Sequence, residues 1–137
     1  MAIVRSKGTK VQHTVSATLV DIAQVLSIEH SGCGSITFDS TTLDGGVYKT
    51  KAASGYSNPG TVAIEGFYDP ALAGHKAITA LITTPAANAM KLIYADTAAT
   101  NQAFTQAGVE FGVTVAMEDG LKFTATYEVT GDPGWPV

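Results

Sequence analysis

The sequence of 137 residues is poor in charge. Only 15% of its residues are Asp, Glu, Lys or Arg, against roughly 25% in an ordinary soluble domain. The apolar share, 45%, is ordinary, and Thr, Ala, Gly and Ser replace the missing charges. Two interpretations remain open: much of the surface is buried in an assembly, or the chain is a Thr-rich β-protein that needs few charges.

Cysteines and long hydrophobic runs are also scarce. The single Cys33 cannot form an internal disulfide, and no second Cys or nearby His offers metal-ligand spacing, so neither a disulfide framework nor a zinc site is expected. No stretch approaches the ~18 uncharged apolar residues of a membrane span. The start, MAIVRSKGTK, has basic residues without the apolar run of a secretory signal. We therefore expect one domain, made in the cytoplasm, with no membrane insertion.

Signatures of catalysis and cofactor binding are missing. Nucleophile motifs such as G-x-S-x-G are absent, and His13, His30 and His75 fall in unrelated predicted elements. "GCGSIT" lacks the third glycine and the helix of a phosphate loop, and Asp39 and Asp44 lack the further ligands of a calcium loop. A pI of about 5.1 and a net charge of -4 argue against sequence-specific nucleic-acid readout. We expect no enzyme activity, no cofactor and no metal.

Strict alternation is the strongest structural signal that is present. Apolar or small residues occupy every second position from Val109 to Met117 and from Leu121 to Val129, on either side of an Asp-Gly pair. This pattern predicts a β-hairpin with one core face and one polar or small face. At roughly 3.4 Å per residue, each arm of about nine residues spans about 30 Å, which suits a wall.

The rest of the chain predicts further strands and one helix. The helix is expected at about 69–82, with Asp69 as its N-cap, Pro70 at its first position, and apolar residues at helical spacing. The other predicted strands are Lys10–Leu19, Ala23–Glu29, Ser35–Phe38, Thr61–Tyr68, Met90–Tyr94 and Ala103–Ala107. The predicted fold class is mostly β: a β-sandwich or barrel of antiparallel strands with one flanking α-helix.

A polar stretch at about 38–60, "FDSTTLDGGVYKTKAASGYSNPG", is predicted as a long loop. Structureless loops of this length are uncommon inside a compact domain, so it is disordered, functional, or ordered only against a partner. Lys49 and Lys51 lie in it, while Arg5, Lys7 and Lys10 cluster near the N-terminus. This segregation suggests contact with acidic surfaces, including those of identical subunits; solvated, mobile segments are the alternative.

The order of these parts resembles the tail tube, or major tail, proteins of long-tailed bacteriophages. The resemblance rests on the short basic N-terminal arm, on "AQVLSIEHSG" running into the long loop, on "TVAIEGFYDP" with its helix, and on "GVEFGVTVAMEDGLKFTATYEVTGDPGW". It covers nearly the whole chain. It implies a single tail-tube-like domain, 1–137, with an N-terminal arm (1–9), a long inter-subunit loop (38–60) and a short C-terminal tail (131–137).

The resemblance also implies a function. The chain would be a virion structural protein that forms stacked, hexameric rings, and the rings would make the tail tube through which the genome passes during ejection. Its partners would be further copies of itself and the tape measure, tail terminator and distal tail proteins, with DNA passing non-specifically. Contacts between subunits or rings are expected at Arg5, Lys7, Lys10, Asp39, Thr41, Asp44, Tyr48, Lys49, Lys51 and Tyr56. Glu110, Glu118, Lys122 and Glu128 are expected to face the lumen and keep DNA from adhering.

Two alternatives stay open. One is a carbohydrate-binding or virion-decoration β-sandwich, for which Tyr48, Tyr56 and Trp135 are the candidate aromatic residues. The other is the inner tube protein of a contractile injection system.

Overall fold

The computed structural model describes residues 6–15, 18–96, 98–117 and 120–135. These residues form nine strands and one helix. The elements are β1 (Lys10–Val15), β2 (Thr18–Asp21), β3 (Val25–Ser31), β4 (Gly34–Asp39), β5 (Lys51–Asn58), β6 (Thr61–Phe67), α1 (Ala73–Thr83), β7 (Asn88–Ile93), β8 (Asn101–Thr114) and β9 (Lys122–Thr130).

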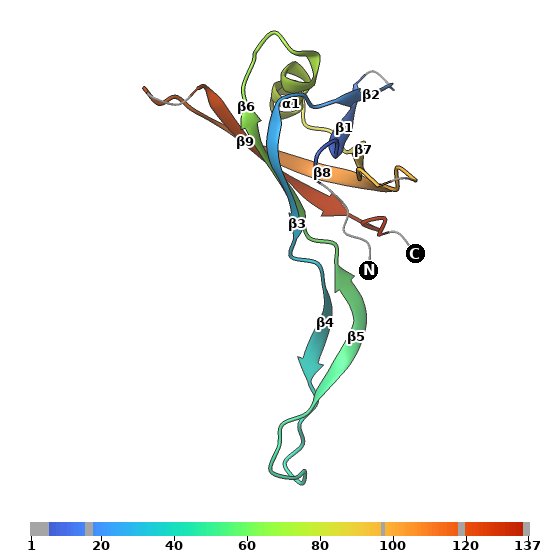
Figure 1. The fold of residues 1–137 in the computed structure, drawn as a ribbon. Helices are drawn as coiled ribbons and strands as arrows, with labels where there is room; N and C mark the ends of the chain where they lie inside the picture. Colours follow the sequence, from blue (N-terminus) through green and yellow to red (C-terminus); the bar gives the residue numbers. More distant parts are fainter. Residues whose placement is uncertain (1–5, 16–17, 97, 118–119, 136–137) are drawn as a thin grey trace.

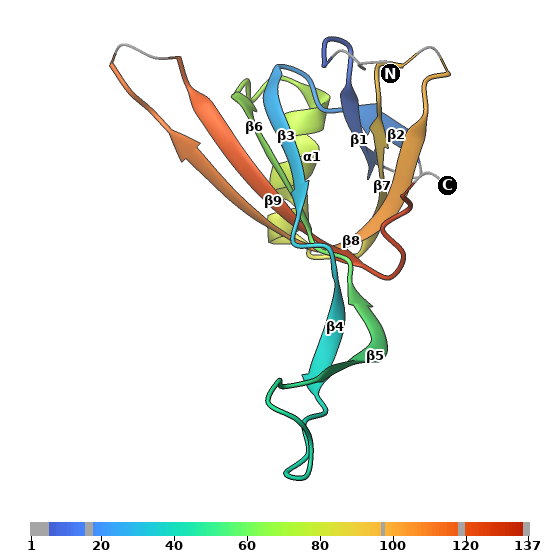
Figure 2. The same cartoon turned by 60° about the horizontal axis from the view of Figure 1, so that its bottom comes forward.

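Seven strands form one antiparallel sheet in the order β2-β1-β7-β8-β9-β6-β3. The long strand β8 belongs to two layers of the sheet. Its residues 105–114 pair with β9 and belong to the first layer, with β9, β6 and β3; its residues 101–106 pair with β7 and belong to the second layer, with β7, β1 and β2. A register shift between Gln106 and Gly108 marks the change, as β-bulges bend strands. The sheet thereby folds over itself into a sandwich (Figures 1 and 2). Its end strands β2 and β3 are not paired with each other among the described residues, so the predicted sandwich is confirmed and the barrel is not closed.

The core lies between the two layers. The helix α1 packs against β8, β1 and β2. Ile78 of α1 is fully buried. The close approach of α1 to the sheet requires Gly74, because a Cβ there would lie 2.6 Å from the carbonyl oxygen of Asp21. The buried apolar side chains are Val11, Ile22, Val62, Ile64, Ile78, Met90, Leu92, Phe104, Phe123, Ala125, Tyr127 and Val129.

The predicted hairpin is confirmed, since β8 pairs with β9, and the strand predicted over Ala103–Ala107 is the first part of β8. Phe123, Ala125, Tyr127 and Val129 are buried, as the alternation predicts. Strand β8 ends at Thr114, so the expected continuation to 117 is wrong. The alternation of apolar residues continues past the edge of the core, which is why pattern alone overestimates the strand. The Asp-Gly turn begins at 119, outside the described residues.

Two other boundaries differ from expectation. The strand predicted over Lys10–Leu19 is two strands, β1 and β2, which pair with each other antiparallel. The predicted helix is confirmed but begins at Ala73, after the N-cap residue Leu72. Asp69 instead forms a turn before the helix: its side chain accepts the N–H of Ala71 at 2.9 Å, and its own N–H donates to His75 Nδ1 at 3.0 Å.

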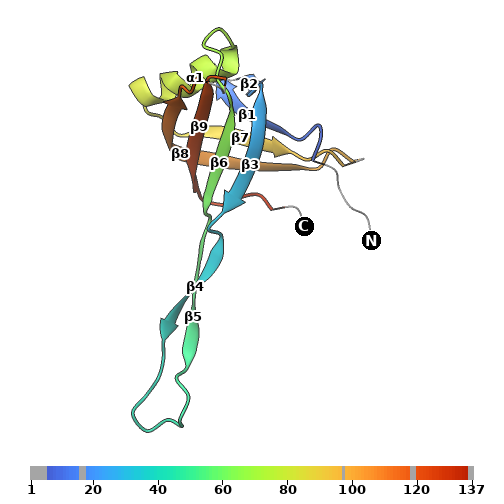
Figure 3. The ribbon, with the colours of Figure 1, turned by 60° about the vertical axis from the view of Figure 1, so that its left-hand side comes forward.

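The loop predicted at 38–60 is shorter than expected. Residues 38–39 belong to β4, and Lys51–Asn58 is strand β5. It pairs with β4 in a separate two-stranded sheet that projects from the sandwich as an arm (Figures 1 and 3). Only residues 40–50 join the two strands. Both faces of the arm are largely exposed, so its sequence lacks the alternation of apolar and polar residues that marks a half-buried strand.

Candidate assembly surface

The outer face of the four strands β3, β6, β9 and β8 is polar and acidic. It lies opposite the core face, because successive side chains in a strand point to opposite sides. The cross-strand register places Glu29, Ala63, Thr126 and Glu110 in one row across all four strands. The neighbouring rows add Glu65 and Glu128. All four of these glutamates are exposed.

Three of the four residues predicted to face a lumen therefore lie on one face. Glu110 and Glu128 are exposed there, and Lys122, on the same face of β9, is half-buried. Glu118 lies outside the described residues. Glu29 and Glu65 were not predicted for this face, because the sequence does not show that β3 pairs with β6 and that β6 pairs with β9. Whether this face lines a lumen stays a prediction.

This four-stranded part of the sheet has two unpaired edges, one on each side. Beyond residue 106, β8 pairs only with β9, and β3 pairs only with β6, among the described residues. The direction of the free backbone groups follows from two bonds, Tyr68 N–H to the oxygen of Leu121 at 2.7 Å and Val129 N–H to the oxygen of Gly60 at 3.2 Å.

In an antiparallel strand, the backbone N–H and C=O groups of successive residues point to opposite neighbouring strands. The two bonds show that the backbone groups of the odd-numbered residues of β9 point to β6, so those of the even-numbered residues point to β8. The partners of the latter on β8 are also even-numbered. Consequently the backbone groups of Val109, Phe111 and Val113 point to the free edge of β8. The same alternation leaves those of Ile28 and His30 at the free edge of β3.

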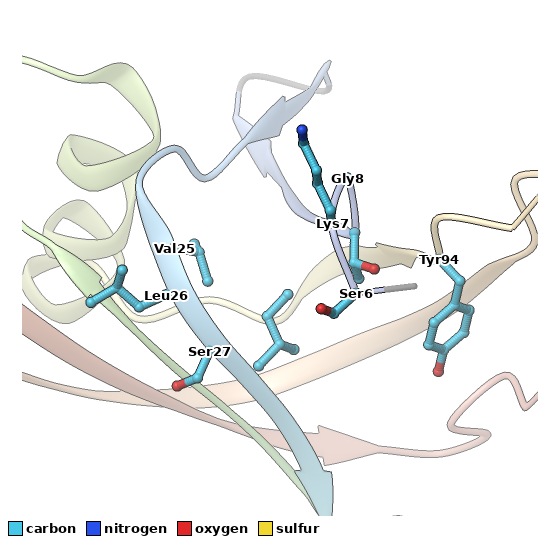
Figure 4. A pocket seen from close by; sticks show the side chains of 9 residues that line it. Ser6, Lys7, Gly8, Val25, Leu26, Ser27 and Tyr94 are labelled. Carbon is cyan, nitrogen blue, oxygen red and sulfur yellow. The ribbon is translucent and has the colours of Figure 1, made fainter. Parts of the chain in front are cut away.

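A groove of about 720 Å³ runs beside the free edge of β3. Residues 6–9 form its other wall, and Tyr94 closes one end (Figure 4). Val25 lies on the groove side of β3, while Leu26 lies on the other side. Lys7, a predicted contact residue, is on the far wall and exposed. The groove leaves the opening between the two layers accessible from the β3 side.

The arm gathers most of the predicted contact residues on one projection. Asp39 and Lys51 face each other across its strands. Thr41 holds the end of the ladder, since its hydroxyl accepts the N–H of Thr50 at 2.8 Å. Hydrogen bonds from the Thr41 side chain and backbone lower the pKa of Asp39. The remaining predicted contact residues on the arm, all exposed, are Asp44, Tyr48, Lys49 and Tyr56.

The other predicted contact residues lie elsewhere. Lys10 begins β1 in the second layer, where its Nζ is 3.9 Å from an Asp21 oxygen, an exposed pair of little energetic weight. Arg5 lies outside the described residues. Lys7 and Lys10 therefore lie on the sandwich and not on the arm.

Large apolar side chains are exposed at two opposite ends of the molecule. Leu43, Val47 and Tyr48, near the end of the arm, are 87% exposed or more. Val115 and Met117, beyond the end of β8, are 79% and 100% exposed. The arm and the β8–β9 hairpin project in different directions from the sandwich (Figures 1 and 2). Exposed apolar groups of this kind mark interaction sites.

At the base of the arm, His30 lies beside Cys33, a contact that the sequence analysis did not predict. Cys33 Sγ is 3.2 Å from His30 Nε2, and both groups contact the carbonyl oxygen of Pro59. Trp135, a candidate for glycan stacking, instead places one face of its indole against the His30 ring at 4.8 Å between centroids. No cluster of three potential metal ligands occurs in the described ranges.

Among the described residues, no helix is both long enough and apolar enough to cross a membrane; α1 has only 11 residues.

No family model matches the chain, and no curated protein matches its sequence. Solved structures do match. A chain in the tail of an empty gene transfer agent particle, refined with C6 symmetry, superposes with a TM-score of 0.80 at 10% identity, over 97% of this chain and 98% of that one. A chain in the six-fold symmetrised baseplate of the anti-feeding prophage has a TM-score of 0.71 at 10% identity, over 96% and 94%. The predicted resemblance is thus confirmed in fold: this chain has the fold of phage-tail-type structural proteins.

Proposed function

We propose that this chain is a structural protein of a phage-like tail that forms stacked, hexameric rings, and that the stacked rings make a tube through which DNA passes. The observation that carries the proposal is the pair of free edges on the sheet of β3, β6, β9 and β8. Because the edges differ, copies join edge to edge in a head-to-tail manner, and such contacts form a ring where the rotation between copies closes. The six-fold symmetry of the two assemblies with similar chains supports the ring number.

Ring closure determines which face is inside. The core face of this sheet carries the second layer and α1, with the His75 ring 4.7 Å from the Phe123 ring. A layer of this bulk fits on the outside of a closed ring of sheets. The polar face then lines the channel, with Glu29, Glu65, Glu110 and Glu128 toward the DNA. Carboxylates disfavour close approach of phosphates within about 8 Å, the Debye length in physiological salt.

The exposed arm supplies contacts to other copies. An isolated two-stranded hairpin is marginally stable in water, and here it leaves Ile36 and Phe38 about half exposed. Packing against a neighbouring copy covers these side chains. Stacking joins the arm of one copy to a copy in the next ring. The contact would include the predicted contact residues of the arm and, from outside the arm, Lys7 and Lys10.

The edge contact is tested by a proline at Val113. Its N–H points to the free edge of β8, so Val113→Pro removes a donor that only a neighbouring copy uses; edge strands tolerate proline. Val113→Ala is the matched control, since it shortens the side chain and keeps the amide. In negative-stain electron microscopy, we expect rings or tubes with a central channel from the wild type and Val113→Ala. Val113→Pro should remain a folded single copy.

Two results would count against the proposal. Rings formed equally well by Val113→Pro and Val113→Ala would exclude the edge of β8 as the contact. Failure of the wild type to form any ring or tube, in cell extracts and at high concentration, would exclude self-assembly itself.

A further inference from the structure

The arm joins the sandwich at a gap between the seven-stranded sheet and the two-stranded sheet. The β3–β6 ladder ends with the pair Ser31 and Thr61, and the β4–β5 ladder begins with Gly34 and Asn58. Between them, Gly32 and Gly60 face each other in the left-handed region, with φ of 80° and 82°. The direction of the arm is therefore set by two glycine linkers and by the side chains that bridge them.

His30 is the central bridging side chain. Gln102 Nε2 lies 2.8 Å from both the Pro133 oxygen and His30 Nδ1. Because a carbonyl oxygen only accepts, the Gln102 amide nitrogen donates to Pro133, and its second N–H donates to His30 Nδ1. The Tyr94 hydroxyl fixes the same orientation by donating to Gln102 Oε1 at 2.7 Å.

This arrangement places the imidazole proton on Nε2. From there it donates to the Pro59 oxygen, at 3.0 Å, on the β5 side of the arm base. Cys33, on the β4 side, donates its S–H to the same oxygen at 3.1 Å. Since Nε2 already carries a proton, the ring cannot act as a base toward the thiol in this arrangement. His30 and Cys33 thus connect the arm base and do not form a nucleophile–base pair.

The C-terminal tail, residues 131–135, holds His30 from the other side. The Trp135 ring stacks on the imidazole, with an interplanar angle of 8°. Pro133 accepts from the same Gln102 that orients His30. Gly134 lies so close to β8 that a Cβ there would be 2.1 Å from the Ala103 oxygen. The tail is therefore fixed to the sandwich and contacts the residue that bonds to the arm.

We propose that residues 131–135 are a latch that fixes the direction of the arm through His30. Within the latch, Trp135 holds the plane of the imidazole; Gln102 of β8, outside the latch, sets the tautomer. A groove of about 500 Å³, lined by Cys33, Asn58, Asp132 and Trp135, separates the tail from the arm base. Without the stack, the imidazole turns away from Pro59, and the arm moves about the two glycine linkers.

In the tube that we propose, the latch determines whether the arm points at the neighbouring ring; this consequence rests on the proposed function. The latch itself is a property of one copy and is tested on one copy. Spin labels at Gly46→Cys, near the end of the arm, and at Lys76→Cys, on α1, report the direction of the arm. Both positions are exposed, and Cys33→Ser provides the background because a serine O–H still donates to Pro59.

Distances between the labels are measured by pulsed electron paramagnetic resonance at a concentration at which sedimentation shows single copies. The background protein and Trp135→Phe, which keeps a stacking ring, should give one narrow distance distribution. Trp135→Ala should broaden it, with the unlatched population raised about fivefold, as expected for loss of one aromatic stack. Tyr56→Ala, which removes an exposed aromatic from the arm away from the tail, is the control and should stay narrow.

Trp135 is at the surface, so melting temperatures should confirm that the Trp135→Ala variant is folded. A second variant, Gln102→Glu, replaces the amide donor by an acceptor and should broaden the distribution in the same way. Narrow, unshifted distributions in both Trp135→Ala and Gln102→Glu would overturn the latch, whether or not the wild type forms tubes. Tube formation is scored separately, so a failure of the proposed function leaves these distances interpretable.

Discussion

Gly60 at the base of the arm allows the sharpest test of how the arm is attached. Its φ is 82°, a conformation that L-residues rarely adopt. A Cβ at this position would lie 2.3 Å from the carbonyl oxygen of Ser31 and 3.0 Å from both the nitrogen and the Sγ of Cys33. Two of these three atoms are backbone, so Gly60→Ala cannot be accommodated by rotation of a side chain.

Gly131 provides the matched control. Its φ is 74°, and a Cβ there has no atom within 4 Å. Gly131→Ala therefore carries only the conformational cost, about 1–2 kcal/mol. Gly60→Ala carries that cost plus a displacement of the ladder end, which overpacking data place at about 1–3 kcal/mol more. We expect Gly60→Ala to lose about 2–5 kcal/mol of the free energy of unfolding.

The free energies of unfolding are measured by urea denaturation followed by far-ultraviolet circular dichroism. The two variants should differ in denaturation midpoint at an unchanged m-value. Equal losses in the two variants would refute the argument, since both glycines have a positive φ and only Gly60 has atoms close to the added methyl group.

Two further predictions concern charge. Among the described residues of the polar face, Glu110→Lys with Glu128→Lys leaves two glutamates and three lysines. Tubes of this variant should form but retain DNA, measured by the ultraviolet absorbance ratio after purification; tubes free of DNA would argue against a lumenal face. Burial, followed by the nearby His75, lowers the pKa of His13 below its ordinary 6.5. The unfolded chain therefore takes up a proton first, and stability present above pH 6.5 is lost as the pH falls toward the folded pKa, by at most about 1.4 kcal/mol per pH unit. His13→Leu removes the titrating ring and should remove this slope in urea titrations, and an unchanged slope would assign it to other groups.

The parts of the fold that the sequence predicts are those buried within one chain. Phe123, Ala125, Tyr127 and Val129 alternate because one face of β9 meets the core, and the hairpin follows from that alternation. The helix is visible for the same reason. Its start was misplaced because Asp69 and Pro70 favour a helix start locally, while the Asp69 N–H is already used by His75. Tertiary contacts thus decided a boundary that local signals could not.

The candidate site was predicted only where it coincides with that hairpin. Glu110 and Glu128 were placed on one face correctly relative to each other, since period two fixes their side of the sheet. Glu29 and Glu65 join the same face through the pairing of β3 with β6 and of β6 with β9. Pairing between strands far apart in the chain has no local sequence signal.

The strands of the arm could not be predicted from hydrophobic periodicity. Hydrophobic periodicity reports burial inside a chain, and β4 and β5 are largely exposed within theirs. The apolar residues they do carry, Ile36, Phe38 and Tyr56, follow no period that a single copy explains. A strand whose partner surface lies on another copy is selected for that surface, so its pattern becomes interpretable only when the neighbour is in place. In the proposed assembly, the same reasoning would account for the low charge of the chain, because residues that a soluble monomer would keep charged are then residues that other copies cover.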